Sequence, residues 1–128
     1  MNECELIIEG GEVIDGAGGP RFSADVAVTG GRIVATGDLS DWQAAERIDA
    51  TGLIVAPGFI DAHTHDDRLL FSDPSMAPKA SQGVTTVVVG NCGVSLAPLA
   101  IDGRPPPPLD LVAGDGQWRF GGFVDFLD

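Results

Sequence analysis

Two histidines, His63 and His65, are the only histidines in the sequence, and they stand two residues apart. They end a short apolar run that follows Pro57-Gly58, and such a run predicts a β-strand. Because side chains alternate faces along a strand, both imidazoles would point the same way and could bind one cation. Asp61 would lie on that face, as a carboxylate that orients a ring. The spacing predicts a metal site, although two histidines on a strand also form ordinary hydrogen bonds.

Cys92 is a further group that could bind a metal, because a thiolate is a strong zinc ligand. Two other interpretations stay open from the residues alone. Cys92 could be buried and inert, or it could be a nucleophile, which requires a histidine base hydrogen-bonded to its sulfur. Asp66 and Asp67 either help to hold a cation or substrate, or are ordinary loop carboxylates. Lys79 is expected to be a surface charge on a helix.

The elements that must position these residues are a strand, a helix and a second strand. The first strand follows Pro57-Gly58, a short helix is predicted over roughly Ser75 to Gln82, and Val84 to Val89 is an almost continuous β-branched run. We expect the second strand to be buried on both faces and parallel to the first. His65 and Cys92 then stand at or just beyond the carboxyl ends of their strands, where (β/α)₈ barrels form their active sites.

The first 55 residues are predicted to form short strands separated by glycines. Gly10-Gly11 and Gly30-Gly31 each stand between apolar runs, which predicts two β-hairpins. Leu39 to Glu46 is expected to form a helical turn, and Leu53 to Val55 a strand. These strands fit a small sheet that packs on something else, and we assign no chemistry to it.

Composition excludes several classes of function. A net charge of −12, from 19 acidic and 7 basic residues, argues against binding nucleic acid or an anionic membrane surface. No apolar run approaches the ~18 residues of a membrane span, and the N-terminus is acidic where a signal peptide would be basic. We therefore expect a cytoplasmic protein. Two cysteines, Cys4 and Cys92, do not make a disulfide framework.

Two motifs together resemble a known family. Pro57-Gly58-Phe59-Ile60-Asp61, followed by His63 and His65, resembles the first barrel strand of the amidohydrolase superfamily. The run Gly83-Val84-Thr85-Thr86-Val87-Val88-Val89-Gly90-Asn91-Cys92-Gly93 is similar to the N-acyl-D-amino-acid deacylase (D-aminoacylase) branch. The similarity extends from Glu5 to Phe126, over nearly the whole chain.

The resemblance implies an α/β fold with two parts. Residues 1–55 would be strands of a small β-sandwich domain, and residues 56–128 would begin a metal-dependent (β/α)₈ TIM barrel that is incomplete here. His63, His65 and Cys92 would bind Zn²⁺, with the cysteine in place of the carboxylated lysine of other branches. The implied reaction is zinc-assisted hydrolysis of a linear amide, in which an N-acyl-D-amino acid yields a carboxylate and a D-amino acid. A small-molecule substrate is the partner implied.

The sequence also departs from the family pattern, because no histidine follows His65. The two further histidine ligands and the acid/base aspartate that the resemblance implies on later strands are missing. We therefore expect an N-terminal fragment of an amidohydrolase, with no catalytic residue of its own and no activity alone. Two alternatives remain: a hydantoinase- or dihydroorotase-like cyclic amidohydrolase, against which Asn91-Cys92-Gly93 argues, and a noncatalytic metal-binding fragment.

Overall fold

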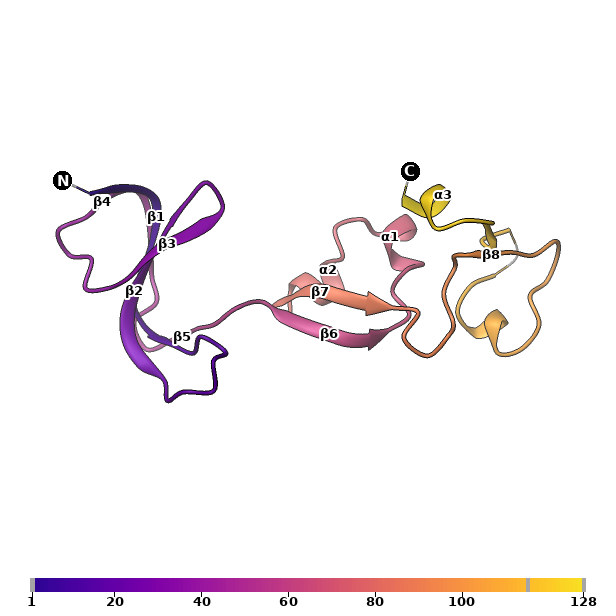
Figure 1. Ribbon diagram of the computed structural model, residues 1–128, viewed down its shortest axis with the longest axis horizontal. Coiled ribbons are helices and arrows are strands. Elements are labelled where there is room, and N and C mark those ends of the chain that lie inside the picture. Colours follow the sequence, from indigo (N-terminus) through magenta and orange to yellow (C-terminus); the bar gives the residue numbers. More distant parts are fainter. Residues whose placement is uncertain (1, 115, 128) are drawn as a thin grey trace. The chain divides into compact units, whose positions relative to one another are not determined.

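The computed structural model describes residues 2–114 and 116–127. The chain divides into two compact units, one ending at Pro57 and one beginning at Gly58 (Figure 1). Strands dominate the first unit, and the second combines short strands with short helices. Within the described residues, no helix is both long enough and apolar enough to cross a membrane.

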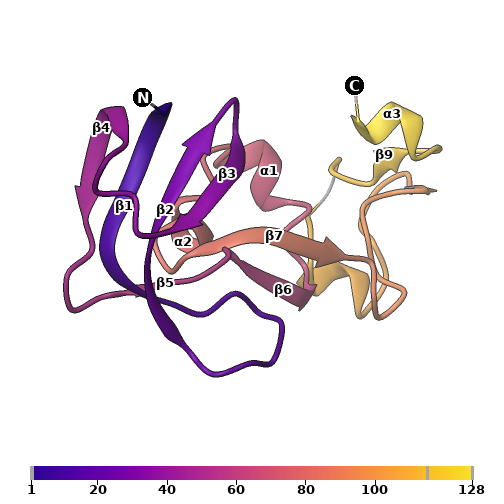
Figure 2. The ribbon, with the colours of Figure 1, turned by 60° about the vertical axis from the view of Figure 1, so that its left-hand side comes forward.

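The first unit is built on one mixed sheet. Its strands are β1 (Glu3–Val13), β2 (Phe22–Thr29), β3 (Arg32–Gly37), β4 (Gln43–Asp49) and β5 (Ile54–Val55). The strand order is β3-β2-β1-β4, with β5 also paired to β1 (Figure 2). β1 pairs antiparallel with β2 and parallel with β4 and β5, so that the long first strand organises the unit.

The two Gly-Gly pairs of this unit have different structures. At Gly30-Gly31 the predicted hairpin is confirmed: both glycines have positive φ, at 58° and 69°, and they join the antiparallel strands β2 and β3. At Gly10-Gly11 the predicted hairpin is wrong, because β1 continues through both residues with a shift in its pairing to β2. A Cβ on Gly11 would collide with the Val55 side chain, so the glycine lets β5 approach closely.

The helical turn predicted over Leu39 to Glu46 is also wrong, since β4 begins at Gln43. Only the start of this segment is a turn, closed by a hydrogen bond from the Trp42 N–H to the Leu39 carbonyl oxygen at 2.9 Å. Leu39 is buried together with Ile7 and Ala27. Parallel pairing with β1 and this small core outweigh the weak local preference for helix.

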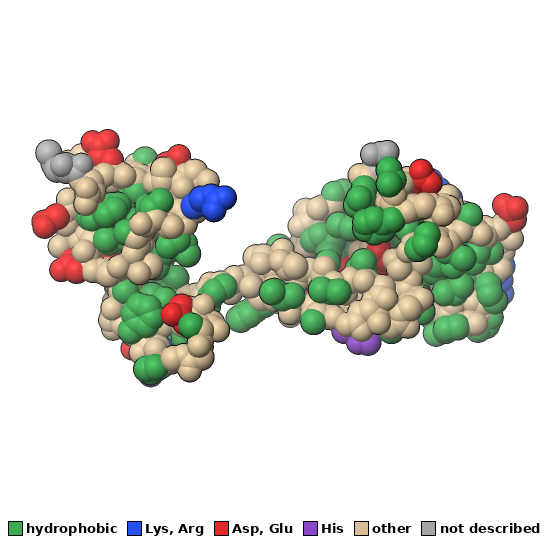
Figure 3. All heavy atoms as spheres, viewed as in Figure 1, with side chains coloured by type: hydrophobic (Ala, Val, Ile, Leu, Met, Phe, Trp, Pro, Cys, Tyr) green, Lys and Arg blue, Asp and Glu red, His purple; other side chains and the backbone are tan. Residues whose placement is uncertain are grey.

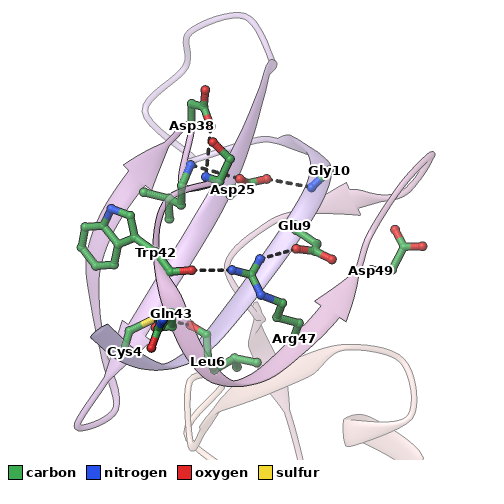
Figure 4. A network of polar contacts seen from close by, with 12 residues as sticks. Cys4, Leu6, Glu9, Gly10, Asp25, Asp38, Trp42, Gln43, Arg47 and Asp49 are labelled. Atoms are coloured by element: carbon green, nitrogen blue, oxygen red, sulfur yellow. Dashed lines mark hydrogen bonds and ion pairs between the residues drawn. The ribbon is translucent and has the colours of Figure 1, made fainter. Parts of the chain in front are cut away.

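Polar contacts hold the strand ends of the first unit in place (Figure 4). The Asp25 carboxylate accepts hydrogen bonds from the backbone N–H groups of Gly10 and Leu39, at 2.9 and 3.2 Å. Arg47 pairs with Glu9 on the neighbouring strand, with Nη1 and Oε2 2.5 Å apart. Asp25, Glu9 and Arg47 therefore have structural roles in this unit.

The second unit contains the predicted strand, helix and strand. β6 (Phe59–Thr64) and β7 (Val84–Val89) pair in parallel, which confirms the pairing predicted from the sequence. Two short helices, α1 (Leu69–Ser72) and α2 (Ala77–Ala80), connect them. The chain then forms β8 (Leu99–Ala100), the 3₁₀ helix η1 (Leu109–Leu111), β9 (Arg119–Phe120) and α3 (Val124–Leu127). β8 and β9 pair antiparallel.

Details of the βαβ connection differ from the prediction. The helix expected from Ser75 to Gln82 is shorter, because Met76 adopts a left-handed conformation with φ of 50° and α2 begins after it. Asp73 is the C-cap residue of α1. Within the described chain β7 is not buried on both faces, since the Val88 side chain is 41% exposed. In the described part of the chain, β6 and β7 pair only with each other.

The segment after β7 forms a small core of its own. Its buried members are Leu96, Ala97, Ala113, Trp118 and Phe120. The Trp118 indole N–H donates to the Ala113 carbonyl oxygen at 3.1 Å, so the ring is both buried and hydrogen-bonded. Phe120 stacks on Phe71 of α1 with ring centroids 5.4 Å apart, which fixes this segment against the connection between β6 and β7.

Candidate metal centre

The parallel pair of strands brings the three predicted ligands together. His63 lies in β6, His65 follows the last residue of β6, and Cys92 lies three residues beyond the end of β7. The ligand atoms of these three residues lie within 4.8 Å of one another. All three residues are exposed, and Figure 3 shows the histidine side chains, in purple, at the surface of the unit that begins at Gly58.

The geometry of these donors fits a tetrahedral metal ion. Cys92 Sγ and His65 Nε2 are 3.6 Å apart. In a tetrahedral zinc site with ordinary Zn–N and Zn–S bonds, a nitrogen and a sulfur ligand are separated by about 3.6 Å. The His63 and His65 rings have centroids 6.0 Å apart and planes at 63°, so they do not stack against each other. Two imidazoles and a thiolate form a donor set typical of zinc.

The exposure of Cys92 and the position of His63 help to distinguish the three interpretations of Cys92. Within the described chain Cys92 is exposed, which argues against the buried, inert cysteine. A nucleophile with His65 as its base would not require His63 at the same point. Convergence of all three groups therefore favours metal binding, and the assignment of a metal to His63, His65 and Cys92 stays a prediction.

Asp61 does not orient an imidazole ring, contrary to the prediction. Its Oδ1 accepts a hydrogen bond from the His63 backbone N–H at 3.2 Å, and its Oδ2 lies 2.6 Å from Lys79 Nζ. Asp61 thus shapes the backbone of β6 at the first histidine. Its side chain is paired with Lys79 of α2.

Lys79 is not a free surface charge, and the prediction that it is one was wrong. From α2 its Nζ reaches Asp61 Oδ2 at 2.6 Å, Asp66 Oδ2 at 2.8 Å and Thr64 Oγ1 at 3.5 Å. The Lys79 side chain is only 22% exposed. One ammonium group therefore joins the residues that flank both histidines to the helix behind them.

The charges of this cluster reinforce one another. The hydrogen bond from Lys79 lowers the pKa of Asp61 below its ordinary value, and the His63 backbone N–H adds to this effect. Burial acts to raise the pKa of Asp66, but hydrogen bonds from Lys79 and Thr64 outweigh burial, so that pKa is also lowered. Asp61 and then Asp66 raise the pKa of Lys79 in return. All three groups are charged at neutral pH.

Asp67 ties the loop after His65 to the loop after Cys92. It is completely buried, and its Oδ2 accepts hydrogen bonds from the Leu96 backbone N–H at 2.6 Å and from the Ser95 hydroxyl at 3.1 Å. The sequence left open whether Asp66 and Asp67 were solvated loop residues. The structure excludes that for both, because each is bound within the protein.

We expect replacement of Lys79 by methionine to lower the midpoint of chemical denaturation. The change leaves the charged carboxylates of Asp61 and Asp66 close together without their shared cation, and partly buried charges of one sign repel. Circular dichroism during urea titration measures the effect. Arg104→Met is the matched control, because Arg104 is 80% exposed and its pair with Asp110 is an ordinary surface contact. Equal midpoints for the two variants would show that Lys79 is only a surface charge.

Comparison with known proteins places the chain among amidohydrolases. A family model described as the amidohydrolase family matches residues 46–125. The chain is 57% identical over 124 residues to a D-aminoacylase of Alcaligenes xylosoxydans xylosoxydans, covering 97% of this chain and 25% of that protein. It is 54% identical over 125 residues to an N-acyl-D-aspartate deacylase of the same organism, covering 98% of this chain and 25% of that protein.

Solved structures agree with these matches. A D-aminoacylase studied for its binuclear metal centre has a TM-score of 0.91 and 56% identity, covering 97% of this chain and 26% of that one. An N-acyl-D-glutamate deacylase from Bordetella bronchiseptica, complexed with zinc and a phosphonate inhibitor, has a TM-score of 0.80 and 49% identity, covering 88% and 24%. The chain spans about a quarter of the length of the curated relatives it matches. The resemblance found in the sequence is confirmed, and the chain belongs to the amidohydrolase family.

Proposed function

We propose that this chain supplies metal-binding strand ends to a zinc-dependent enzyme that deacylates N-acyl-D-amino acids. The observation that carries the proposal is the convergence of His63, His65 and Cys92 at one end of a parallel strand pair. Similarity to a D-aminoacylase and to an N-acyl-D-aspartate deacylase over nearly the whole chain supports the substrate class. The proposed ion is Zn²⁺, because two imidazoles and a thiolate suit it.

The proposed architecture follows from the same similarity. Residues 1–55 would belong to a small β-sandwich domain, and residues 56–128 would contribute the first strands of a (β/α)₈ TIM barrel. The exposed apolar side chains on β6 and β7 support this arrangement, since Phe59 is 61% and Ile60 67% exposed within the described chain. Further barrel strands would cover them.

Two groups of residues in this chain would have separate roles in the enzyme, one in metal binding and one in positioning. His63, His65 and Cys92 would hold the metal, which when bound activates water and polarises an amide carbonyl. Lys79 with Asp61 and Asp66 would keep the end of β6 rigid, and Asp67 would fix the loop after Cys92 beside it. The group that moves a proton to the leaving amine would come from outside this chain. A single positioned group of that kind contributes about 10² to 10⁴ in rate.

A hybrid enzyme tests the proposal. In this hybrid enzyme, the chain replaces the matching quarter of the Alcaligenes D-aminoacylase, to which it is 57% identical. We expect the hybrid enzyme to hydrolyse N-acetyl-D-methionine and to prefer it over the L-enantiomer, whereas the isolated chain and the remaining three quarters are each inactive. Release of the free amino acid is the measurement.

The control is the same hybrid enzyme with His63→Ala and His65→Ala together, which should be folded and inactive. A hybrid enzyme that is folded and loaded with zinc but prefers the L-form, or a cyclic amide such as a hydantoin, would refute the substrate class. Full activity in the double variant would refute the ligand assignment.

A further inference from the structure

A cavity of about 490 Å³ opens beside two of the candidate ligands. His65, Cys92 and Arg68 supply its polar lining, and apolar side chains supply the rest: Val94, Pro108, Leu111 and Val112. Its size falls within the range of small-molecule sites, which are mostly apolar with a few placed polar groups. The cavity lies wholly within the second unit, between the strand ends and the segment around η1.

Arg68 is the one side chain of this lining with a fixed charge, and it lacks a counterion. No ion pair or side-chain hydrogen bond involves Arg68 among the residues that the structure describes. The two acidic residues that precede Arg68 in the sequence bind other groups. Asp66 is paired with Lys79, and Asp67 is completely buried and bound to Leu96 and Ser95. In a chain of net charge −12, this guanidinium at a cavity wall is left unpaired.

A guanidinium group binds a carboxylate through two parallel hydrogen bonds, which gives both energy and orientation. A substrate of the proposed class has its scissile amide nitrogen on the same carbon as its α-carboxylate. In such a ligand the carboxylate is only a few bonds from the scissile amide. When the amide lies at His65 and Cys92, the carboxylate therefore lies close to these residues as well. The apolar wall would receive the acyl group or an apolar side chain.

We propose that Arg68 binds a carboxylate of the substrate in this cavity and thereby positions the amide at the metal ligands. This inference rests on the proposed function. It adds the residue that binds a carboxylate of that substrate. The group recognised is either the α-carboxylate or the side-chain carboxylate of an acidic amino acid, and the substrates of the test distinguish the two.

The test compares Arg68→Met with the unchanged hybrid enzyme. We expect kcat/KM to fall about 10- to 100-fold, mainly through a higher KM, because a charge-assisted pair is lost. Arg68→Lys should recover part of the loss, and zinc content should stay the same in all variants. Arg32→Met, which removes the same charge from an exposed position in the first unit, should leave kcat/KM unchanged.

Two substrates identify the carboxylate that is bound. A loss with both N-acetyl-D-methionine and N-acetyl-D-glutamate assigns the α-carboxylate, and a loss with the glutamate derivative alone assigns the side-chain carboxylate. Unchanged kcat/KM for both in Arg68→Met would overturn the inference and leave the proposed function standing. A folded, zinc-loaded parent hybrid enzyme that hydrolyses neither substrate would overturn the proposed function itself.

Discussion

Replacing Cys92 by alanine in the hybrid enzyme is expected to lower kcat for N-acetyl-D-methionine by at least about 10³-fold, because metal-ion stabilisation of amide hydrolysis amounts to several kcal/mol. Cys92 Sγ lies 3.6 Å from His65 Nε2 and is one of three converging donors, so its loss leaves two ligands from this chain. Two imidazoles on one strand end do not enclose a tetrahedral ion. Zinc content and initial rates are measured on the same preparations.

Two further variants make this result specific. Cys4→Ala removes the other cysteine, which lies in β1 of the first unit, and should leave the rate unchanged. Cys92→Asp replaces the thiolate with another zinc ligand but has no thiol, so partial activity with bound zinc is expected. An inactive Cys92→Asp enzyme with full zinc occupancy would contradict the ligand role and favour a nucleophilic cysteine.

Replacing Asp67 by alanine should cost about 1–3 kcal/mol of unfolding free energy, the penalty for leaving a buried hydrogen-bonding group without its partner. The group left without a partner is the Leu96 backbone N–H, which donates to Asp67 at 2.6 Å in a buried position. Because this bond joins the loops that carry His65 and Cys92, zinc affinity should fall as well. Urea denaturation of the 128-residue chain, followed by circular dichroism, gives the stability change.

Asp67→Asn is the informative control for this prediction. Its amide oxygen can still accept from Leu96, so most of the stability should remain. Asp102→Ala, at an exposed position, should change stability by less than about 0.5 kcal/mol. If Asp67→Ala were as stable as Asp102→Ala, Asp67 would not hold the two loops together.

The sequence predicted the candidate site better than it predicted the first unit. His63, His65 and Cys92 could be brought together because strand alternation and parallel pairing are strong local rules. The two Gly-Gly pairs show that local turn preferences do not by themselves predict a hairpin. Gly10-Gly11 and Gly30-Gly31 have the same turn chemistry. The first pair is part of a continuous strand because Gly11 pairs with Ala24 of β2 and the flanking residues of β1 pair with β4 and β5.

The contacts of Lys79 and Asp67 were not predicted, again because their partners are distant in sequence. Lys79 reaches Asp61 across 18 positions, and Asp67 reaches Leu96 across 29, distances at which no periodic pattern carries information. One signal was available for Lys79. Arg68 and Lys79 are the only Lys or Arg residues between positions 58 and 103, in a segment rich in aspartate, so a counterion role for Lys79 could have been predicted. For the burial of Asp67 the sequence offers no such signal.

Titration of the isolated chain with Co²⁺ tests the central claim most directly, because a thiolate bound to cobalt produces a charge-transfer absorption band that free thiols lack. We predict weak binding with this band in the unchanged chain, since three ligands on an exposed edge only partly enclose an ion. The band should disappear in Cys92→Ser, and affinity should fall strongly in His63→Ala/His65→Ala. Equal Co²⁺ binding by all three proteins, without a thiolate band in any of them, would contradict the assignment of His63, His65 and Cys92 as metal ligands.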